Sequence, residues 1–197
     1  MSSEQPPSSP PASQGAQLVR EWVTVLVVAL VIAITVRTLI LQQFYISGPS
    51  MEATMFQDNR VLVNKLSYRL HDIHRGDVVV FDRVTVDGQI VQHDDLIKRV
   101  IAVGGETISI KDCQVFINGK LLVESYLNEY DLAQTALEDR CRVPMMDDMK
   151  IPDNQLFVMG DNRPQSFDSR MFGPIEEVLV VGRAFVIIWP FSAAKFL

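Results

Sequence analysis

The chain has 197 residues, of which 48% are hydrophobic and 21% are charged, a length and composition ordinary for one globular domain with short additions. The acidic and basic side chains of residues 1–41 cancel, so the whole net charge of −6 lies in residues 42–197. Such an acidic domain argues against nucleic acid as the main partner, because binding phosphates requires clustered Lys and Arg. Two cysteines and three scattered histidines match no metal-binding spacing, so we predict no metal and no cofactor.

Residues 1–17 are predicted to form a disordered tail. The first 15 positions, "MSSEQPPSSPPASQG", contain four prolines and five serines. A segment with so few apolar side chains cannot bury a core and gains nothing by ordering.

Residues 18–41 are predicted to form a transmembrane helix. No charge occurs between Trp22 and Val36, and the apolar stretch continues past Arg37 to Leu41, close to the ~20 residues needed to span the hydrocarbon core. A buried core helix would carry a polar stripe, and a cleaved signal peptide would end in a cleavage site of small residues. This stretch has neither feature. One arginine flanks each end, so charge does not reveal the orientation.

Residues 42–197 are predicted to form a mainly β domain. Two β-rich stretches are interrupted at Asp87-Gly88 and Asn118-Gly119, dipeptides that favour the tight turns of hairpins. A third β-rich stretch covers residues 178–191. Residues 124–150 are polar, acidic and irregular, so we expect an excursion from the sheet, with at most a short helix within residues 127–137.

The two cysteines, Cys113 and Cys141, allow two interpretations. They are ordinary free thiols if the domain faces a reducing compartment, and they can form a disulfide if it faces an oxidising one.

Ser50 is a candidate nucleophile because its loop is constrained. It follows Gly48 and Pro49 within "FYISGPSMEATMF", where proline fixes its own φ and glycine permits a tight backbone path. A nucleophile needs such a rigid position. No histidine stands in a comparable setting, so a Ser-His-Asp triad is unsupported.

Lys98 is the candidate base, because a lysine can accept the proton of a serine only when its pKa is depressed. Burial in apolar surroundings lowers that pKa. In a strand, Lys98 shares a face with Leu96 and Val100, while Arg99 points to the other side. The alternative is an edge-strand lysine that points into water.

A third segment, "MGDNRPQSFDSRMFGPI" at residues 159–175, is dense in turn-forming and charged residues. Its charged side chains could form a buried network of ion pairs and hydrogen bonds, or a solvated surface loop. The four side chains concerned are Asp161, Arg163, Asp168 and Arg170.

Four segments together resemble the bacterial type I signal peptidases. These are "SGPSMEATM", "RGDVVVF", "IKRVIAVGGE" and "GDNRPQSFDSRMFG", which occur in that order from residue 47 to residue 173. The resemblance implies a single-pass enzyme of the cell membrane with a β-rich catalytic domain on the extracytoplasmic side. Its implied partners are the lipid bilayer and secretory preproteins, from which such serine proteases remove signal peptides.

The resemblance also assigns roles to individual residues. Ser50 would be the nucleophile, Lys98 the general base, and Ser166 the residue whose hydroxyl orients that lysine. The other matched positions are Arg99 with Asp161 as a salt bridge, Asp168 with Arg170 as a structural pair, and Met51 beside the nucleophile. Some family members carry a serine at the position of Gly48, where its hydroxyl stabilises the oxyanion, so the second oxyanion donor stays open here.

The expected reaction is acyl transfer, with the Ser50 amide as one oxyanion donor and an extended substrate paired with a strand. Shallow apolar pockets, with Ile97 and Met51 as wall candidates, should accept only small residues at positions −1 and −3 before the cut. Two alternatives remain: a self-cleaving Ser-Lys protease and a non-catalytic membrane-anchored β domain. The terminal aromatic residues Trp189, Phe191 and Phe196 are expected at the membrane interface or in a last core strand.

Overall fold

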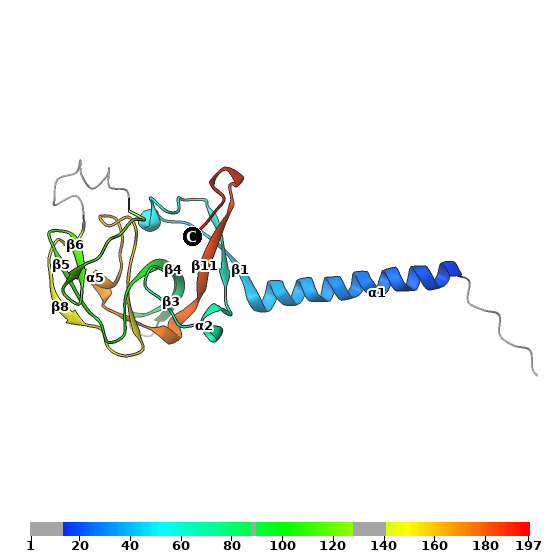
Figure 1. Cartoon of the computed structure of the whole chain (residues 1–197), viewed down its shortest axis with the longest axis horizontal. Helices are drawn as coiled ribbons and strands as arrows, with labels where there is room; N and C mark the ends of the chain where they lie inside the picture. The colour runs from blue at the N-terminus through cyan, green and yellow to red at the C-terminus, as the bar shows by residue number, and fades with distance from the viewer. Residues whose placement is uncertain (1–13, 88–89, 128–140) are drawn as a thin grey trace, which may run out of the picture. The chain divides into compact units, whose positions relative to one another are not determined.

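The computed structural model describes residues 14–87, 90–127 and 141–197 (Figure 1). The chain separates into two compact units, residues 1–40 and residues 41–197.

The first unit contains helix α1, Gln14–Thr35, followed by a π-helical turn (η1) at Val36–Ile40. Within the described part of the chain, residues 17–35 form one helix long and apolar enough to cross a membrane, with a mean hydropathy of 2.2 and none of that stretch buried. These bounds differ from the predicted 18–41. The helix already includes residues 14–17, assigned above to a disordered tail, where two glutamines and an alanine favour a helix and outnumber the unfavourable Gly15. Leu41 instead begins a strand.

The second unit is mainly β, as predicted, and its described residues form two antiparallel sheets. The larger sheet has eight strands in the order β1-β2-β11-β3-β4-β9-β10, with β12 paired to β11. Its strands are β1 Leu41–Tyr45, β2 Arg60–Asn64, β3 Val78–Asp87, β4 Ile90–Val103, β9 Gln155–Met159, β10 Ile175–Glu176, β11 Val180–Trp189 and β12 Lys195–Phe196.

The smaller sheet has four strands in the order β7-β6-β5-β8, and β5, β6 and β8 lie together in Figure 1. Its strands are β5 Thr107–Lys111, β6 Gln114–Ile117, β7 Lys120–Leu121 and β8 Met146–Lys150. Among the described residues, the short helices are α2 Ser67–Leu70, α5 Ser169–Phe172 and the 3₁₀ turns η2 Pro49–Met51, η3 Glu177–Leu179 and η4 Phe191–Ala193.

Both hairpin predictions fall between paired strands. Asn118 and Gly119 join β6 to β7 with φ values of 51° and 76°, which confirms the predicted turn, because a type I′ turn needs positive φ at both central residues. Strands β3 and β4 pair as far as Asp87 with Ile90, although the turn between them lies outside the described residues.

The prediction for residues 124–150 was wrong at its C-terminal end, where β8 pairs with β5. The sequence "MDDMK" has little preference for strands, and its strand conformation depends on backbone hydrogen bonds to a neighbour distant in the sequence. The short helix predicted within residues 127–137 lies outside the described residues, apart from Leu127.

The cysteine pair is a disulfide, Cys113–Cys141. It joins the turn between β5 and β6 to the segment that leads into β8. Cys141 is buried, with 4% of its surface exposed. The disulfide therefore tethers the segment around Cys141 to the smaller sheet.

Candidate active site

Ser50 lies in the 3₁₀ turn η2, which is separated from the end of β1 by three residues. Gly48 caps the turn in an extended conformation, with a φ of −139°, and Pro49 occupies its first position. Met51 is completely buried and anchors the turn in the core. The carbonyl of Ser50 accepts a hydrogen bond of 3.1 Å from the Asn162 amide, so the turn is also tied to the loop after β9.

Lys98 on β4 meets Ser50 directly. Its Nζ donates a hydrogen bond of 2.8 Å to Ser50 Oγ and another of 2.9 Å to the Ile97 carbonyl. Lys98 is 3% exposed, and its neighbours on the same strand face, Leu96 and Val100, both belong to one apolar cluster. The apolar surroundings expected for a base are therefore present.

The pKa of Lys98 follows from this environment. Burial lowers it to about 8, although the carboxylates of Asp168 and Asp161 oppose the shift. Nearly neutral pH therefore suffices to give this amine an uncharged fraction able to accept a proton.

Arg99 and Asp161 form the ion pair that the resemblance implied. Arg99 donates through Nε and Nη2 to the two carboxylate oxygens at 2.9 and 2.7 Å, and the side chains are 7% and 0% exposed. The Thr54 hydroxyl donates to Asp161 and accepts a bond of 3.2 Å from Arg99. This pair therefore connects the strand of Lys98, the loop of Ser50 and the start of the loop after β9.

Asp168 and Arg170 form the second implied pair. Two hydrogen bonds of 2.8 Å join the guanidinium to the carboxylate, which also accepts a bond of 3.0 Å from the Gly160 amide. Burial acts to raise the pKa of Asp168, but the hydrogen bonds and charge of Arg170 outweigh it and hold the pKa below its usual value. The carboxylate is thus a fixed negative charge.

Ser166 is completely buried beside these groups. Its hydroxyl makes no well-formed hydrogen bond with any described residue, although it lies close enough to Asp168 to help lower the pKa of that carboxyl. The amine of Lys98 instead contacts Ser50 and the Ile97 carbonyl. A role for Ser166 in orienting Lys98 stays a prediction.

A cavity of about 140 Å³ opens beside Ser50 and Lys98. Ile97 and Gly48 line it, but Met51 does not, contrary to its prediction as a wall residue: its side chain packs into the core behind the turn. The full lining is Phe44, Tyr45, Ile46, Ser47, Gly48, Ser50, Val80, Asp95, Leu96, Ile97 and Lys98.

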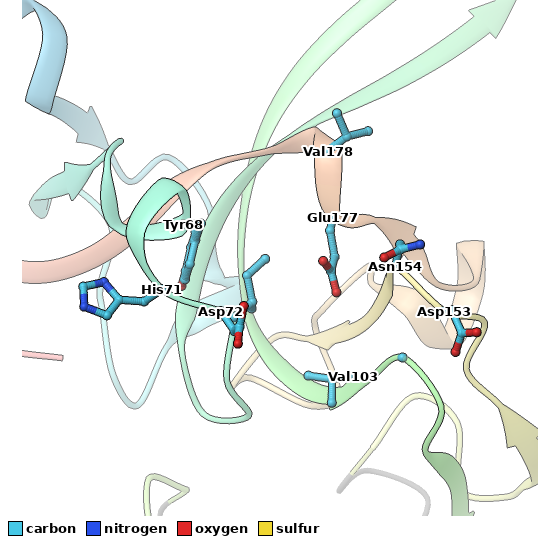
Figure 2. A pocket seen from close by; sticks show the side chains of 10 residues that line it. Tyr68, His71, Asp72, Val103, Asp153, Asn154, Glu177 and Val178 are labelled. Carbon is cyan, nitrogen blue, oxygen red and sulfur yellow. The ribbon is translucent and has the colours of Figure 1, made fainter.

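A larger hollow of about 580 Å³ shares no lining residue with this cavity. Figure 2 shows the Glu177 carboxylate directed into it and the His71 ring turned away. Its lining contains acidic side chains but no nucleophile paired with a base, and among the described residues no cluster could hold a metal ion. Of these two hollows, the smaller one is lined by Ser50 and Lys98, the residues predicted from the sequence, and the larger one by neither.

Sequence reasoning missed three residues of the network around the site. Thr54 lies inside the "SGPSMEATM" segment, so its place in the sequence could have marked it as a residue near the site. Glu124 and Tyr126 contact the site's arginines from the excursion, where nothing in the local sequence distinguishes them from other polar residues.

Comparisons with known proteins show which family this chain is similar to. A profile of the family described as "Signal peptidase, peptidase S26" matches residues 19–189. The chain is 37% identical to "Probable signal peptidase I-2" of Synechocystis over 157 residues, covering 80% of this chain and 67% of that protein. It is 39% identical to "Signal peptidase I V" of Bacillus subtilis over 166 residues, covering 83% and 95%. A solved signal peptidase I from Enterococcus faecalis is 29% identical and covers 57% of this chain and 97% of that chain, with a TM-score of 0.44.

Proposed function

Because the chain belongs to the type I signal peptidases of the peptidase S26 family, serine peptidases that remove signal peptides from preproteins, we propose that Ser50 and Lys98 form its catalytic dyad. Family membership removes the alternative of a non-catalytic β domain. The observation that carries the proposal is the 2.8 Å contact between Lys98 Nζ and Ser50 Oγ in a buried setting.

In the proposed reaction, uncharged Lys98 takes the proton of the Ser50 hydroxyl as Oγ attacks the scissile carbonyl. The Ser50 amide is a donor for the oxyanion that forms. The ammonium of Lys98 then protonates the leaving amine, which leaves the substrate's signal peptide as an ester on Ser50. Lys98, uncharged again, removes a proton from water as the water oxygen attacks this ester. The bond to Ser50 Oγ then breaks, and Lys98 returns the proton to Oγ, which releases the signal peptide as a carboxylic acid.

The substrate is proposed to lie extended between β1 and β4. Strand β1 lies at one edge of its sheet, and the part of β4 before Arg99 has no second partner among the described strands. Residues of both segments line the cavity beside Ser50. A cavity of about 140 Å³ with Ile97 and Val80 in its wall suits small side chains at positions −1 and −3, since a bulky residue would not fit without rearrangement.

The apolar helix is proposed to anchor the enzyme in the cell membrane, with the catalytic domain of residues 42–197 on the extracytoplasmic side. Ser50 follows Leu41 by nine residues, which span at most about 30 Å, so the nucleophile stays near the bilayer surface where a membrane-inserted signal peptide ends. The exposed aromatic side chains of Trp189, Phe191 and Phe196 suit the same interface.

The test is cleavage of a preprotein by the full chain in detergent, with the cut mapped by mass spectrometry. Ser50→Ala and Lys98→Ala should each abolish cleavage, because the two groups act as one unit, whereas Lys120→Ala on the exposed strand β7 should not. More than trace activity in either dyad variant, with the same cut, would contradict the proposal.

The same assay tests the pocket. Preproteins with Ala at −1 and −3 should be cut, and Phe at −1 should block the cut. Equal cleavage of both at one site would rule out a small −1 pocket.

A further inference from the structure

The excursion after β7 contacts the site through Tyr126. The Tyr126 ring lies 4.0 Å from the guanidinium carbon of Arg99, the residue that follows Lys98 and pairs with Asp161. A guanidinium stacked on an aromatic face gains a cation–π attraction, strongest where water is excluded. Arg99 is 6% exposed, so the ring acts on a largely desolvated cation.

A second contact joins the excursion to the loop after β9. Glu124 receives hydrogen bonds from both terminal nitrogens of Arg163, and the two side chains are 10% and 4% exposed. Arg163 also donates through Nε to the Gly160 carbonyl at 3.0 Å, and its own carbonyl accepts a bond of 2.8 Å from Arg170. Arg163 therefore links the two ends of residues 160–170 by hydrogen bonds, and the Glu124 carboxylate compensates its charge.

The two contacts are coupled. The Tyr126 hydroxyl donates a hydrogen bond of 2.6 Å to Glu124, and burial, followed by the charge of Glu124, raises the pKa of Tyr126, so the phenol stays protonated. The other end of the excursion adds a backbone bond of 3.4 Å from the Arg142 amide to the Arg163 carbonyl, next to the disulfide at Cys141.

We propose that Glu124 and Tyr126 are positioning residues of the peptidase reaction, which hold Arg163 and Arg99 and thereby fix residues 160–170 around Lys98. This inference rests on the proposed dyad. Neither residue lines the cavity beside Ser50, so neither is expected to touch the substrate.

The physical reason lies in the charges that face Lys98. The carboxylates of Asp161 and Asp168 both favour its protonated form, and Arg99 and Arg170 compensate them. If Tyr126 no longer holds Arg99 against Asp161, that carboxylate acts more strongly on Lys98. The pKa of Lys98 then rises, and less of the amine is uncharged at a given pH.

The test compares Tyr126→Leu with Tyr126→Phe as the matched control. Loss of the ring should move the acidic limb of the pH–rate profile to higher pH, and therefore lower kcat about tenfold at a fixed pH below the wild-type limb, with KM nearly unchanged. The Phe variant keeps the aromatic face, so its limb should stay in place. A Leu variant with the wild-type kcat and limb would overturn the inference. An activity loss that only follows the amount of folded protein, with an unmoved limb, would also overturn it, because it would mean a purely structural role.

A second pair of variants keeps the test decisive if Tyr126→Leu fails to fold. Glu124→Gln removes the charge opposite Arg163 and should lower kcat at constant KM, whereas Glu124→Asp should recover part of the rate. Equal rates in the wild type, Gln and Asp variants would overturn the role of Glu124. The proposed function fails separately, through active Ser50→Ala or Lys98→Ala enzyme, and that result does not depend on Glu124 or Tyr126.

Discussion

The side chain of Lys98 is subject to two opposed influences. Burial disfavours its ammonium form, while Asp168 and Asp161 favour it, and burial prevails. Each of these carboxylates is also paired with an arginine, Asp161 with Arg99 and Asp168 with Arg170. The amine is therefore mostly uncharged once the pH exceeds its pKa of about 8.

The pH dependence of cleavage follows from this balance. At pH values below its pKa of about 8, Lys98 is mostly protonated and, as the proposed base, cannot accept the Ser50 proton. In that range kcat/KM should rise about tenfold per pH unit, and it should level off at higher pH. The measurement is kcat/KM for one preprotein across pH in full-length enzyme. An acidic limb near 10, the ordinary value for lysine, would contradict a buried base.

Gly48 lines the cavity beside Ser50. Its φ of −139° is extended backbone, and an added Cβ would meet no atom within 4 Å. Gly48→Ser should therefore fold normally and, if its hydroxyl reaches the oxyanion, turn over at an unchanged or moderately higher rate. Turnover at equal folded protein is the measurement. A large loss of rate with normal stability would show that this position is needed for substrate clearance.

At the scale of elements, the loop between β9 and α5 holds the site together. It places Asp161 against Arg99 and Asp168 against Arg170, and its Asn162 amide holds the Ser50 carbonyl. The loop begins at Gly160, where a Cβ would lie 2.3 Å from both the Ser50 carbonyl oxygen and Ser166 Oγ. Only glycine allows the turn of Ser50 to approach this closely.

Gly160→Ala should therefore displace Ser50 and reduce kcat about 10²-fold, the effect of a misplacement near 1 Å. Gly182→Ala is the matched control, because its Cβ would lie 2.5 Å from the Asn64 carbonyl oxygen, between β11 and β2. That variant should lose stability but keep its kcat per folded molecule. A Gly160→Ala enzyme as active as the wild type would show that the turn can shift without affecting the chemistry.

For the whole catalytic unit, the disulfide links residues 28 positions apart in the sequence. A cross-link of this span restricts the unfolded chain. It also tethers the C-terminal end of the excursion that carries Glu124 and Tyr126.

Removing the disulfide should therefore lower the free energy of unfolding by about 2–5 kcal/mol. The measurement is urea unfolding of the full chain in detergent, comparing the wild type with a Cys113→Ser/Cys141→Ser variant. A reductant should destabilise the wild type and leave the variant unchanged. Coincident unfolding curves for wild type and variant would contradict a stabilising bond.

Several features could be predicted from the sequence because they depend on neighbouring residues. The apolar helix follows from an uninterrupted apolar composition, and the turn at Asn118-Gly119 follows from two residues that tolerate positive φ. The mainly β class follows in the same way from β-rich stretches between turn-forming residues. The segments of Ser50 and Lys98 were recognisable for a different reason, namely that each lies within a motif resembling a known family.

Other features depended on contacts between distant parts of the chain. The tertiary structure decided that Met51 packs into the core instead of the cavity wall, that the cysteines are bonded, and that "MDDMK" forms a strand beside β5. It also decided the partners of the site's arginines, since Glu124 lies 39 positions from Arg163 in the sequence. Burial, charge pairing and the pKa of Lys98 arise from how these segments pack, and the local pattern around each residue does not contain that information.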